Sequence, residues 1–507
     1  KPNFFISGKN KKTYYTSRSF VFKHSNNKYR FIKKGKDKII SLAKVEEVEV
    51  ESLDESFKKT APAQNVPDEF AGIFSSEAGL ESASAIFDTP NESKEVKASS
   101  MSLKFSSKST FYFQKPSDEK GDIDQQFFHQ DVKLTYSDSH KINHFSSINY
   151  GLFLEGSNRK HLYNDFNFPQ NMQSPQRDYF YINELYYLHS SDNYDIQIGK
   201  KILKLGKGMV YSPTDSITAS DVSIPTAPVF LGNYIVSLDY YKDDWTYSFI
   251  YFPIVTPNKS AAQNSRWSIL YNDINFNLNQ ELENSKSLFK RPILLKAAGT
   301  KFGTDWMFAF YNGANPTPAI RNDITVNGNT PTFNLVQEYV PITFVSSGFS
   351  TVFAGMELHG EVLVQNAKEG RDDSFIAQML GTRYTMDSWP KMLGLDNIDL
   401  IFEYGRETLR EAQTKPYYAT SSLETRIYQN SIVGSVIFNF TQRASLNYDF
   451  HIDNKNNGSA TLVSFNYASL NSGQFRIKME MYEGAPESIF GIWDKNDNIG
   501  FQYSYTY

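Results

Sequence analysis

Hydrophobic and polar residues alternate with a period of two along much of the chain after residue 99. The clearest case is the final segment, 498–507, where Phe501, Tyr503, Tyr505 and Tyr507 alternate with small or polar residues. This period places the two sets on opposite faces of a β-strand, so one face is wholly aromatic. The pattern predicts a strand with lipid on its aromatic side and water on the other. The alternative is a soluble sheet that ends on a tyrosine-rich strand.

Similar segments recur, separated by clusters of Asn, Asp, Ser, Gly and Lys. Many have the roughly 9–11 residues that a tilted strand needs to cross a bilayer. Strand candidates lie at 101–113, 128–136, 148–155, 178–189, 194–204, 234–241, 245–253, 293–301, 305–312, 332–344, 352–364, 373–385, 398–407, 430–440, 444–453, 460–468, 475–482 and 498–507. We therefore expect an all-β fold, an antiparallel transmembrane barrel of about 18 strands, with 16 as the alternative even number.

The predicted connections between these strands are unequal in length. Short turns are expected at 441–443, 453–458 and 471–473, and long loops at 156–177, 205–232, 254–292, 313–331, 408–429 and 483–497. Barrels of the bacterial outer membrane carry short turns on one rim and long loops on the other. A soluble sandwich or propeller would show more even spacing.

Composition supports the same class. The 507 residues include 40 Phe and 32 Tyr, yet the mean hydropathy is −0.48, as expected when every strand has one lipid-facing and one water-facing side. No segment approaches the roughly 20 apolar residues of a spanning helix. Cysteine is absent, which excludes disulfides and thiolate metal sites. The chain begins at Lys1 without an apolar leader, so we expect that a signal peptide has been removed.

The first 98 residues differ from the rest. Lys and Arg dominate residues 1–45, where Asp37 is the one acid, and Asp and Glu dominate residues 46–95. Residues 28–50 contain short β-like runs, and residues 52–98 resemble a linker with a short helix near 66–87. We predict a periplasmic extension or plug at 1–98 and a barrel at 99–507. The basic stretch is expected to be solvated, to pair with the acidic stretch, or to contact anionic lipid or a protein partner, and nucleic acid is not expected because no binding motif accompanies the charge.

Charged residues in the strand candidates fall on the polar faces, where they would line the lumen. Arg or Lys facing lipid at mid-bilayer costs about 2–4 kcal/mol, so this confinement is informative. The predicted lumen residues are Lys133, Lys201, Asp239, Glu357, His359, Glu361, Asp399, Glu403, Asp449, Arg476, Lys478 and Glu480. For each of them, ordinary pairing in a hydrated lumen is the alternative to a role in solute passage. As a set, the acids Glu357, Glu361, Asp399 and Glu403 favour cations, and Lys201, Arg476 and Lys478 form a basic patch for anionic groups.

Signals for catalysis or cofactor binding are weak. Glu357, His359 and Glu361 share a strand face, but no second His or Cys has a suggestive spacing, so we predict no metal site. Ser, His and Asp show no nucleophile-elbow pattern. Gly206-Lys-Gly208 lacks the spacing and the following Ser or Thr of a phosphate loop. We expect no cofactor and no enzymatic activity.

Residues 194–215 contain Ile198-Gly199-Lys200-Lys201, then Leu205-Gly206-Lys207-Gly208, then Pro213-Thr-Asp215. This stretch resembles a recurring segment of large Gram-negative barrels, including those related to alginate-export porins, although Leu205 stands where Trp is usual. The residues also indicate a loop at 205–232 that folds inward and narrows the pore, with Gly206 and Gly208 for sharp turning and Pro213 and Asp215 completing the constriction. The C-terminal strand, with Phe501, Tyr503, Tyr505 and Tyr507, resembles the signal read by the barrel-assembly machinery.

Both resemblances imply the bacterial outer membrane, with the lipid bilayer and lipopolysaccharide as surroundings. The favoured function is a porin-like channel that passes or exports a polar solute, a saccharide being one candidate. The alternatives are a barrel component of a secretion, efflux or electron-transfer complex, in which residues 1–98 dock a periplasmic or surface partner, and a barrel or soluble β-rich enzyme.

Overall fold

A computed structural model gives the fold of the chain. It describes residues 101–115, 126–159, 177–225, 228–261, 265–268, 292–327, 330–368, 370–414, 428–469, 472–485 and 488–507, together with strand segments at 14–16, 20–25, 28–33, 36–41, 277–279 and 418–419. Two compact units are separated near Gln64 and Asn65.

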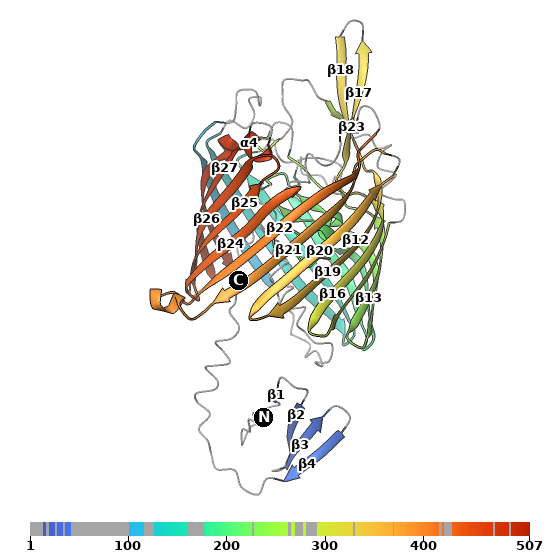
Figure 1. Ribbon diagram of the computed structural model, residues 1–507, viewed down its shortest axis with the longest axis vertical. Helices are drawn as coiled ribbons and strands as arrows, with labels where there is room; N and C mark the ends of the chain where they lie inside the picture. The colour runs from blue at the N-terminus through green and yellow to red at the C-terminus, as the bar shows by residue number, and fades with distance from the viewer. Residues whose placement is uncertain are drawn as a thin grey trace. The chain divides into compact units, whose positions relative to one another are not determined.

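The larger unit is a closed antiparallel barrel of 18 strands in the described residues (Figure 1). The barrel strands are β5 (Ser102–Tyr112), β6 (Phe128–Asn143), β7 (Ser146–Ser157), β8 (Phe180–Ser190), β9 (Tyr194–Lys201), β12 (Asn233–Lys242), β13 (Trp245–Ile254), β15 (Ile293–Lys301), β16 (Thr304–Ala314), β19 (Pro341–Phe353), β20 (Met356–Ala367), β21 (Ser374–Met386), β22 (Asn397–Glu411), β24 (Asn430–Thr441), β25 (Ala444–Asp453), β26 (Gly458–Ala468), β27 (Gly473–Gly484) and β28 (Asn498–Thr506). Strand β28 pairs with β5 and closes the ring, with Phe501 opposite Ser109. The predicted barrel and its larger strand count are confirmed.

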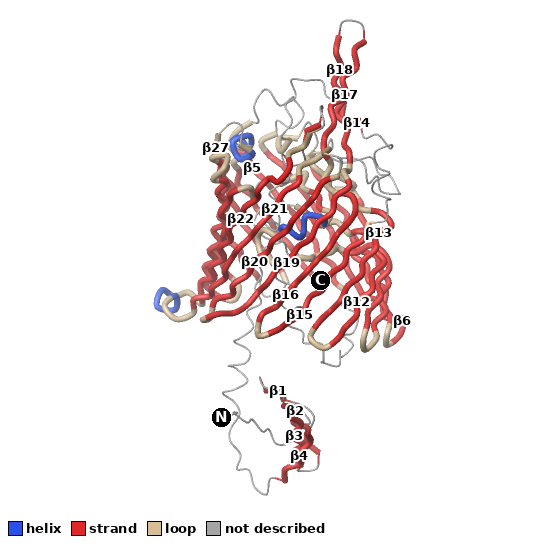
Figure 2. Tube along the Cα trace, turned by 45° about the vertical axis from the view of Figure 1, so that its right-hand side comes forward, coloured by secondary structure: helices blue, strands red, loops and turns tan. Residues whose placement is uncertain are grey.

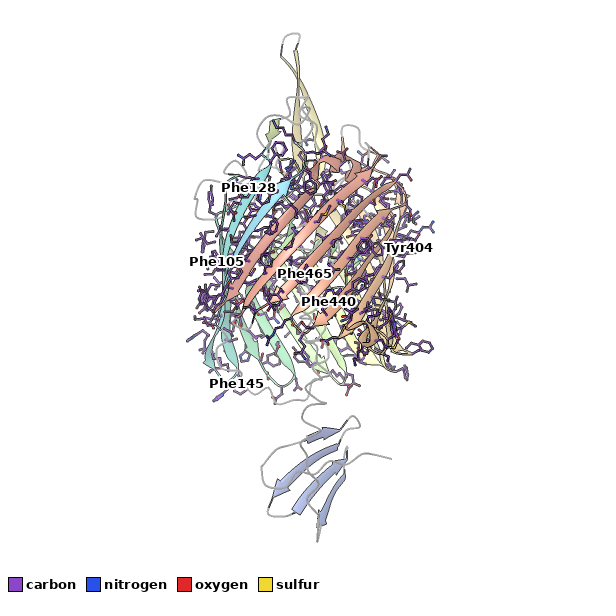
Figure 3. All side chains as sticks on the ribbon, turned by 90° about the vertical axis from the view of Figure 1, so that its left-hand side faces the viewer. Phe105, Phe128, Phe145, Tyr404, Phe440 and Phe465 are labelled. Carbon is purple, nitrogen blue, oxygen red and sulfur yellow. The ribbon has the colours of Figure 1, made fainter. Side chains whose placement is uncertain are left out.

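The outer surface of the barrel is apolar and aromatic. The terminal strand leaves Phe501 37% and Tyr503 47% exposed, and Leu238 on β12 and Phe402 on β22 are similarly open. Figure 3 shows Phe105, Phe128, Phe465 and other labelled aromatic side chains along the outside of the wall. A belt of this kind on a closed barrel is the lipid-contacting surface of a membrane-spanning barrel. We call it the outer belt.

The two rims differ in their connections. On one rim the described strands are joined by tight turns at 144–145, 191–193, 243–244, 302–303, 354–355 and 442–443. The first barrel strand, β5, begins on this rim, and the last, β28, ends on it. The opposite rim carries the long connections, among them the one between β9 and β12. Outer-membrane barrels place short turns toward the periplasm, so we assign the short-turn rim to that side.

Three sequence predictions need correction. The predicted strand 352–364 contains a hairpin turn, because Ala354 and Gly355 adopt positive φ angles of 51° and 80° between β19 and β20. The predicted strand 332–344 spans parts of two separate strands, most of β18 (Thr330–Glu338) and the beginning of β19. The predicted loop 313–331 contains all of β17 (Ala319–Asn327), which pairs with β18 in a second sheet completed by β14 (Asn277–Asn279) and β23 (Tyr418–Ala419).

The turn after Asp453, at residues 454–457, is short as predicted but lies on the long-loop rim, since it joins β25 to β26. The other two predicted short turns lie on the short-turn rim.

In the smaller unit, β1 (Tyr14–Thr16), β2 (Phe20–Ser25), β3 (Lys28–Lys33) and β4 (Lys36–Ser41) form an antiparallel sheet. The predicted helix near 66–87 lies outside the described residues. The domain boundary at residue 98 stays a prediction.

Within the described part of the chain, no helix has the length and the hydropathy to span a membrane.

Candidate functional site

The connection between β9 and β12 enters the barrel and contacts side chains of the opposite wall. Its first part, residues 202–217, is called the inward loop and ends in a short helix, η3 (Pro213–Ile217). Figure 2 shows this helix within the outline of the barrel. The contacts that hold it come from inward-facing residues of β20 and β22, about 150 to 190 positions later in the chain.

Glu361 on β20 is the first anchor of the inward loop. Its carboxylate accepts hydrogen bonds from the backbone N–H of Gly208 at 2.6 Å, the hydroxyl of Ser212 at 3.1 Å and the backbone N–H of Thr214 at 3.2 Å. The N–H of Lys207 also donates to it. Glu361 is only 2% exposed, so this buried charge depends on the loop amides for compensation.

Glu403 on β22 is the second anchor. Its two oxygens accept from three consecutive backbone amides, those of Met209 at 2.7 Å, Val210 at 3.1 Å and Tyr211 at 2.7 Å. The Nε2 atom of His359 lies 2.8 Å from the same carboxylate. His359 and Glu403 are both fully buried. Consecutive amides that converge on a carboxylate form an anion-binding concavity, here filled by the protein's own side chain.

A third carboxylate organises the loop internally. Asp215 accepts from the N–H groups of Leu205 at 2.7 Å and Gly206 at 3.1 Å. The hydroxyl of Ser212 accepts from the N–H of Asp215 at 3.3 Å and caps η3. The backbone from residue 205 to residue 211 is therefore bound almost continuously by acidic side chains.

Two glycines allow this close approach. A Cβ at Gly206 would lie 1.8 Å from the Ser212 hydroxyl and 2.5 Å from Glu361, and a Cβ at Gly208 would lie 2.0 Å from the carbonyl oxygen of Tyr211. At Gly206 the Ser212 and Glu361 side chains would have to move, and at Gly208 the contact is with backbone, so the loop backbone itself would have to shift. The Gly206-Lys-Gly208 segment does not match a phosphate loop. Its backbone instead packs tightly against the Glu361 carboxylate of the barrel wall.

Apolar packing covers one side of the inward loop. Leu203, Leu205 and Ile217 belong to a buried cluster with wall residues such as Phe344 on β19 and Leu363 on β20. Along β19 and β20 the lumen is therefore filled by apolar side chains of the loop and the wall. The sequence predicted a polar lumen, and this sector is an exception because the loop supplies apolar partners for inward-facing apolar residues.

Burial alters the ionisation of loop side chains. Burial lowers the pKa of Lys204 below its ordinary range, against the opposing attraction of Asp215, Glu361 and Glu403. Burial also raises the pKa of Tyr211, and the nearby charge of Glu407 adds to the effect. The Tyr211 hydroxyl accordingly stays neutral and donates to Glu407 at 2.9 Å.

Tyr211 begins a chain of aromatic contacts that runs into the long-loop rim. Its ring stacks on Tyr428 with centroids 3.9 Å apart, and Tyr428 stacks on His451 at 5.0 Å. The rings of His451 and Phe490 are in edge-to-face contact, and Phe490 is in turn in edge-to-face contact with Trp493. The short helix α4 (Ile489–Ile492) carries Phe490. The inward loop is thus packed against the outer loops as well as against the wall.

A different sector of the lumen, around the closing seam of the barrel, carries basic side chains. We call this sector the basic strip. It comprises Lys104 and Lys108 on β5, Lys133 on β6 and Arg476 on β27, all partly exposed. Between them lie Ser106, Ser504 and Gln502, whose amide donates to Ser106 at 3.1 Å. The strip combines positive charge with hydroxyl and amide groups, a lining suited to anionic, hydrated solutes.

The remaining predicted lumen residues have ordinary pairings. Lys201 donates to Gln197 at 2.6 Å, and Gln197 donates to Asp239 at 3.2 Å. Glu357 accepts from Ser350 at 3.0 Å. Buried Lys478 and Glu480 form an ion pair at 2.8 Å. Asp399 accepts from Thr385 and Asp449 accepts from Ser435, and both carboxylates are buried.

The other predicted residues fall into two further groups. His359, Glu361 and Glu403 meet at the inward loop together with the predicted loop residues Gly206, Gly208, Pro213 and Asp215. Lys133 and Arg476 lie in the basic strip. The sequence prediction missed Lys104 and Lys108, although alternation along 101–113 could have indicated their inward position. Across the described residues, no cluster of three or more His, Asp or Glu side chains is arranged to hold a metal ion.

Comparisons with known proteins concern the barrel. No family model matches the chain, and no curated protein sequence matches it. Three similar solved structures are OmpTΔL8 of Vibrio cholerae (9% identity, 81% of this chain and 99% of that chain, TM-score 0.38), OccK8 (OprE) of Pseudomonas aeruginosa (8%, 81% and 98%, 0.44) and OccAB4 of Acinetobacter baumannii (12%, 80% and 98%, 0.44).

The closed barrel, its even number of strands and its outer belt define the class of this protein as a membrane-spanning β-barrel of the Gram-negative outer membrane. Its architecture is porin-like, with the lipid bilayer as its immediate surroundings. The narrower relation to alginate-export porins stays a prediction.

Proposed function

We propose that this protein is a porin-like channel that favours small anionic, hydrated solutes, which pass along the basic strip. One observation carries the proposal. The acidic side chains that would favour cations are largely covered, with Glu361 2%, Glu403 0% and Asp399 1% exposed, whereas Lys104, Lys108, Lys133 and Arg476 are partly exposed. The basic strip therefore presents accessible positive charge, whereas three of the four acids predicted to favour cations are buried and Glu357 is partly exposed.

This proposal replaces the cation preference expected from the acidic row. A carboxylate hydrogen-bonded to several amides has little potential left to attract a passing cation, since its charge is already compensated. The basic strip lines a polar seam, and a lumen of this type selects by charge and by hydrogen bonding. A saccharide bearing a carboxylate or phosphate group has the required chemistry. The proposal assigns no catalytic residue and no cofactor.

The test is the reversal potential of the reconstituted full-length protein in a planar bilayer under a KCl gradient. We expect single-channel currents with chloride more permeant than potassium. The triple variant K104Q/K133Q/R476Q is expected to lower the chloride-to-potassium permeability ratio severalfold, because it removes accessible positive charge. K201Q is the matched control, since Lys201 lies outside the strip and donates to Gln197. Cation-selective currents, or a folded barrel without current, would refute the proposal.

A further inference from the structure

One connection on the short-turn rim departs from the others. The tight turns of this rim contrast with the link between β21 and β22, which occupies residues 387–396 and contains a short helix, η5 (Pro390–Leu393). Gly394 ends the helix in a left-handed conformation with φ 77°. A tight turn would suffice to join antiparallel neighbours, so the additional residues require another explanation.

The surface of this connection is apolar and uncovered. Trp389 is 47%, Met392 83% and Leu393 64% exposed. Exposure of three large apolar side chains within five positions is costly in water. The Trp389 indole N–H lies 3.1 Å from the sulfur of Met386, which ties the ring to the end of β21. Lys391 and Asp396 are exposed beside these residues and give the connection a polar side.

The connection lies outside the barrel wall. Figure 1 shows η5 as the orange coil at the lower left, beyond the ends of the strands, and Figure 2, from a view turned by 45°, again shows it beside the wall. The neighbouring strands contribute Tyr384, Phe402 and Phe440 to the outer belt, with exposures of 39%, 45% and 39%. The apolar residues of the connection therefore continue the lipid-contacting surface toward the short-turn rim.

We propose that residues 387–396 form an interfacial anchor, whose Trp389, Met392 and Leu393 insert at the boundary between headgroups and acyl chains of the periplasmic leaflet. Tryptophan is enriched at this depth because its ring is apolar and its N–H is polar. An amphipathic segment in the interface plane buries its apolar side chains while charged residues reach water. Continuity with the outer belt favours phospholipid over a periplasmic protein as the contact.

The absence of cysteine from the chain permits a direct test. A single cysteine is introduced as M392C in the full-length protein and labelled with the environment-sensitive fluorophore NBD. The barrel is then folded into phosphatidylcholine vesicles that contain lipid spin-labelled near the headgroup. We expect blue-shifted emission, strong quenching by the spin-labelled lipid and several-fold weaker quenching by aqueous iodide than for a control label.

The matched control is D192C, labelled in the same way, because Asp192 is exposed in the polar turn 191–193 of the same rim. Equal iodide quenching at both positions, without lipid quenching at 392, would overturn the proposal. Protection of position 392 that appears only in intact outer membranes, and not in pure lipid vesicles, would also overturn it and would indicate a protein partner. Heat-modifiable migration on gels confirms that both labelled barrels are folded.

Discussion

Removing both anchors of the inward loop, in the double variant E361A/E403A, is expected to raise the single-channel conductance severalfold. Each carboxylate accepts several loop hydrogen bonds from a buried position. A hydrogen bond to a charged group contributes roughly 1.5–3 kcal/mol, and an unpaired buried N–H costs roughly 1–3 kcal/mol. Because about 1.4 kcal/mol shifts an equilibrium tenfold, loss of these bonds should release the loop from the wall.

The measurement is conductance in planar bilayers, with limited proteolysis of the loop in detergent as a second readout. E357Q is the control, because Glu357 faces the lumen on the same strand but accepts from Ser350 and not from the loop backbone. We expect E357Q to conduct like the unmodified protein. If the double variant is folded, resists proteolysis and shows unchanged conductance, the two carboxylates do not hold the loop in place.

Strand alternation was sufficient to predict most of the barrel, because lipid outside and polar groups inside impose the same period on every strand. It failed between residues 332 and 364. There Val352 and Phe353 extend the apolar run up to the turn, and the turn residue Ala354 is not a typical residue for a positive φ. Strands β17 and β18 have a β-like sequence pattern as well, but they belong to the second sheet and not to the barrel.

The sequence indicated both halves of the loop site but not their contact. Gly206, Gly208 and Asp215 were predicted to lie on an inward loop, and Glu361 and Glu403 on inward faces. Their pairing depends on strand order and register across a gap of about 150 to 190 residues, which local periodicity does not encode. Two of the acids predicted to attract cations, Glu361 and Glu403, instead accept hydrogen bonds from backbone N–H groups of the inward loop.

A single methyl group should disturb the loop as strongly as the loss of an anchor. In G208A, the new Cβ would lie 2.0 Å from the carbonyl oxygen of Tyr211 and 3.0 Å from the terminal methyl group of Met379. The first contact is with backbone, so a side-chain rotation cannot relieve it. We expect the segment 207–211 to move away from Glu403, with increased conductance and faster loop proteolysis.

G156A is the matched control for this prediction, because a Cβ at Gly156 on β7 would meet no atom within 4 Å. Both variants add the same methyl group, but only the one at Gly208 would meet neighbouring atoms. We expect G156A to conduct like the unmodified protein. Unchanged conductance and unchanged loop proteolysis in a folded G208A barrel would mean that the loop backbone tolerates the displacement, and the tight fit at Gly208 would then not control the position of the inward loop.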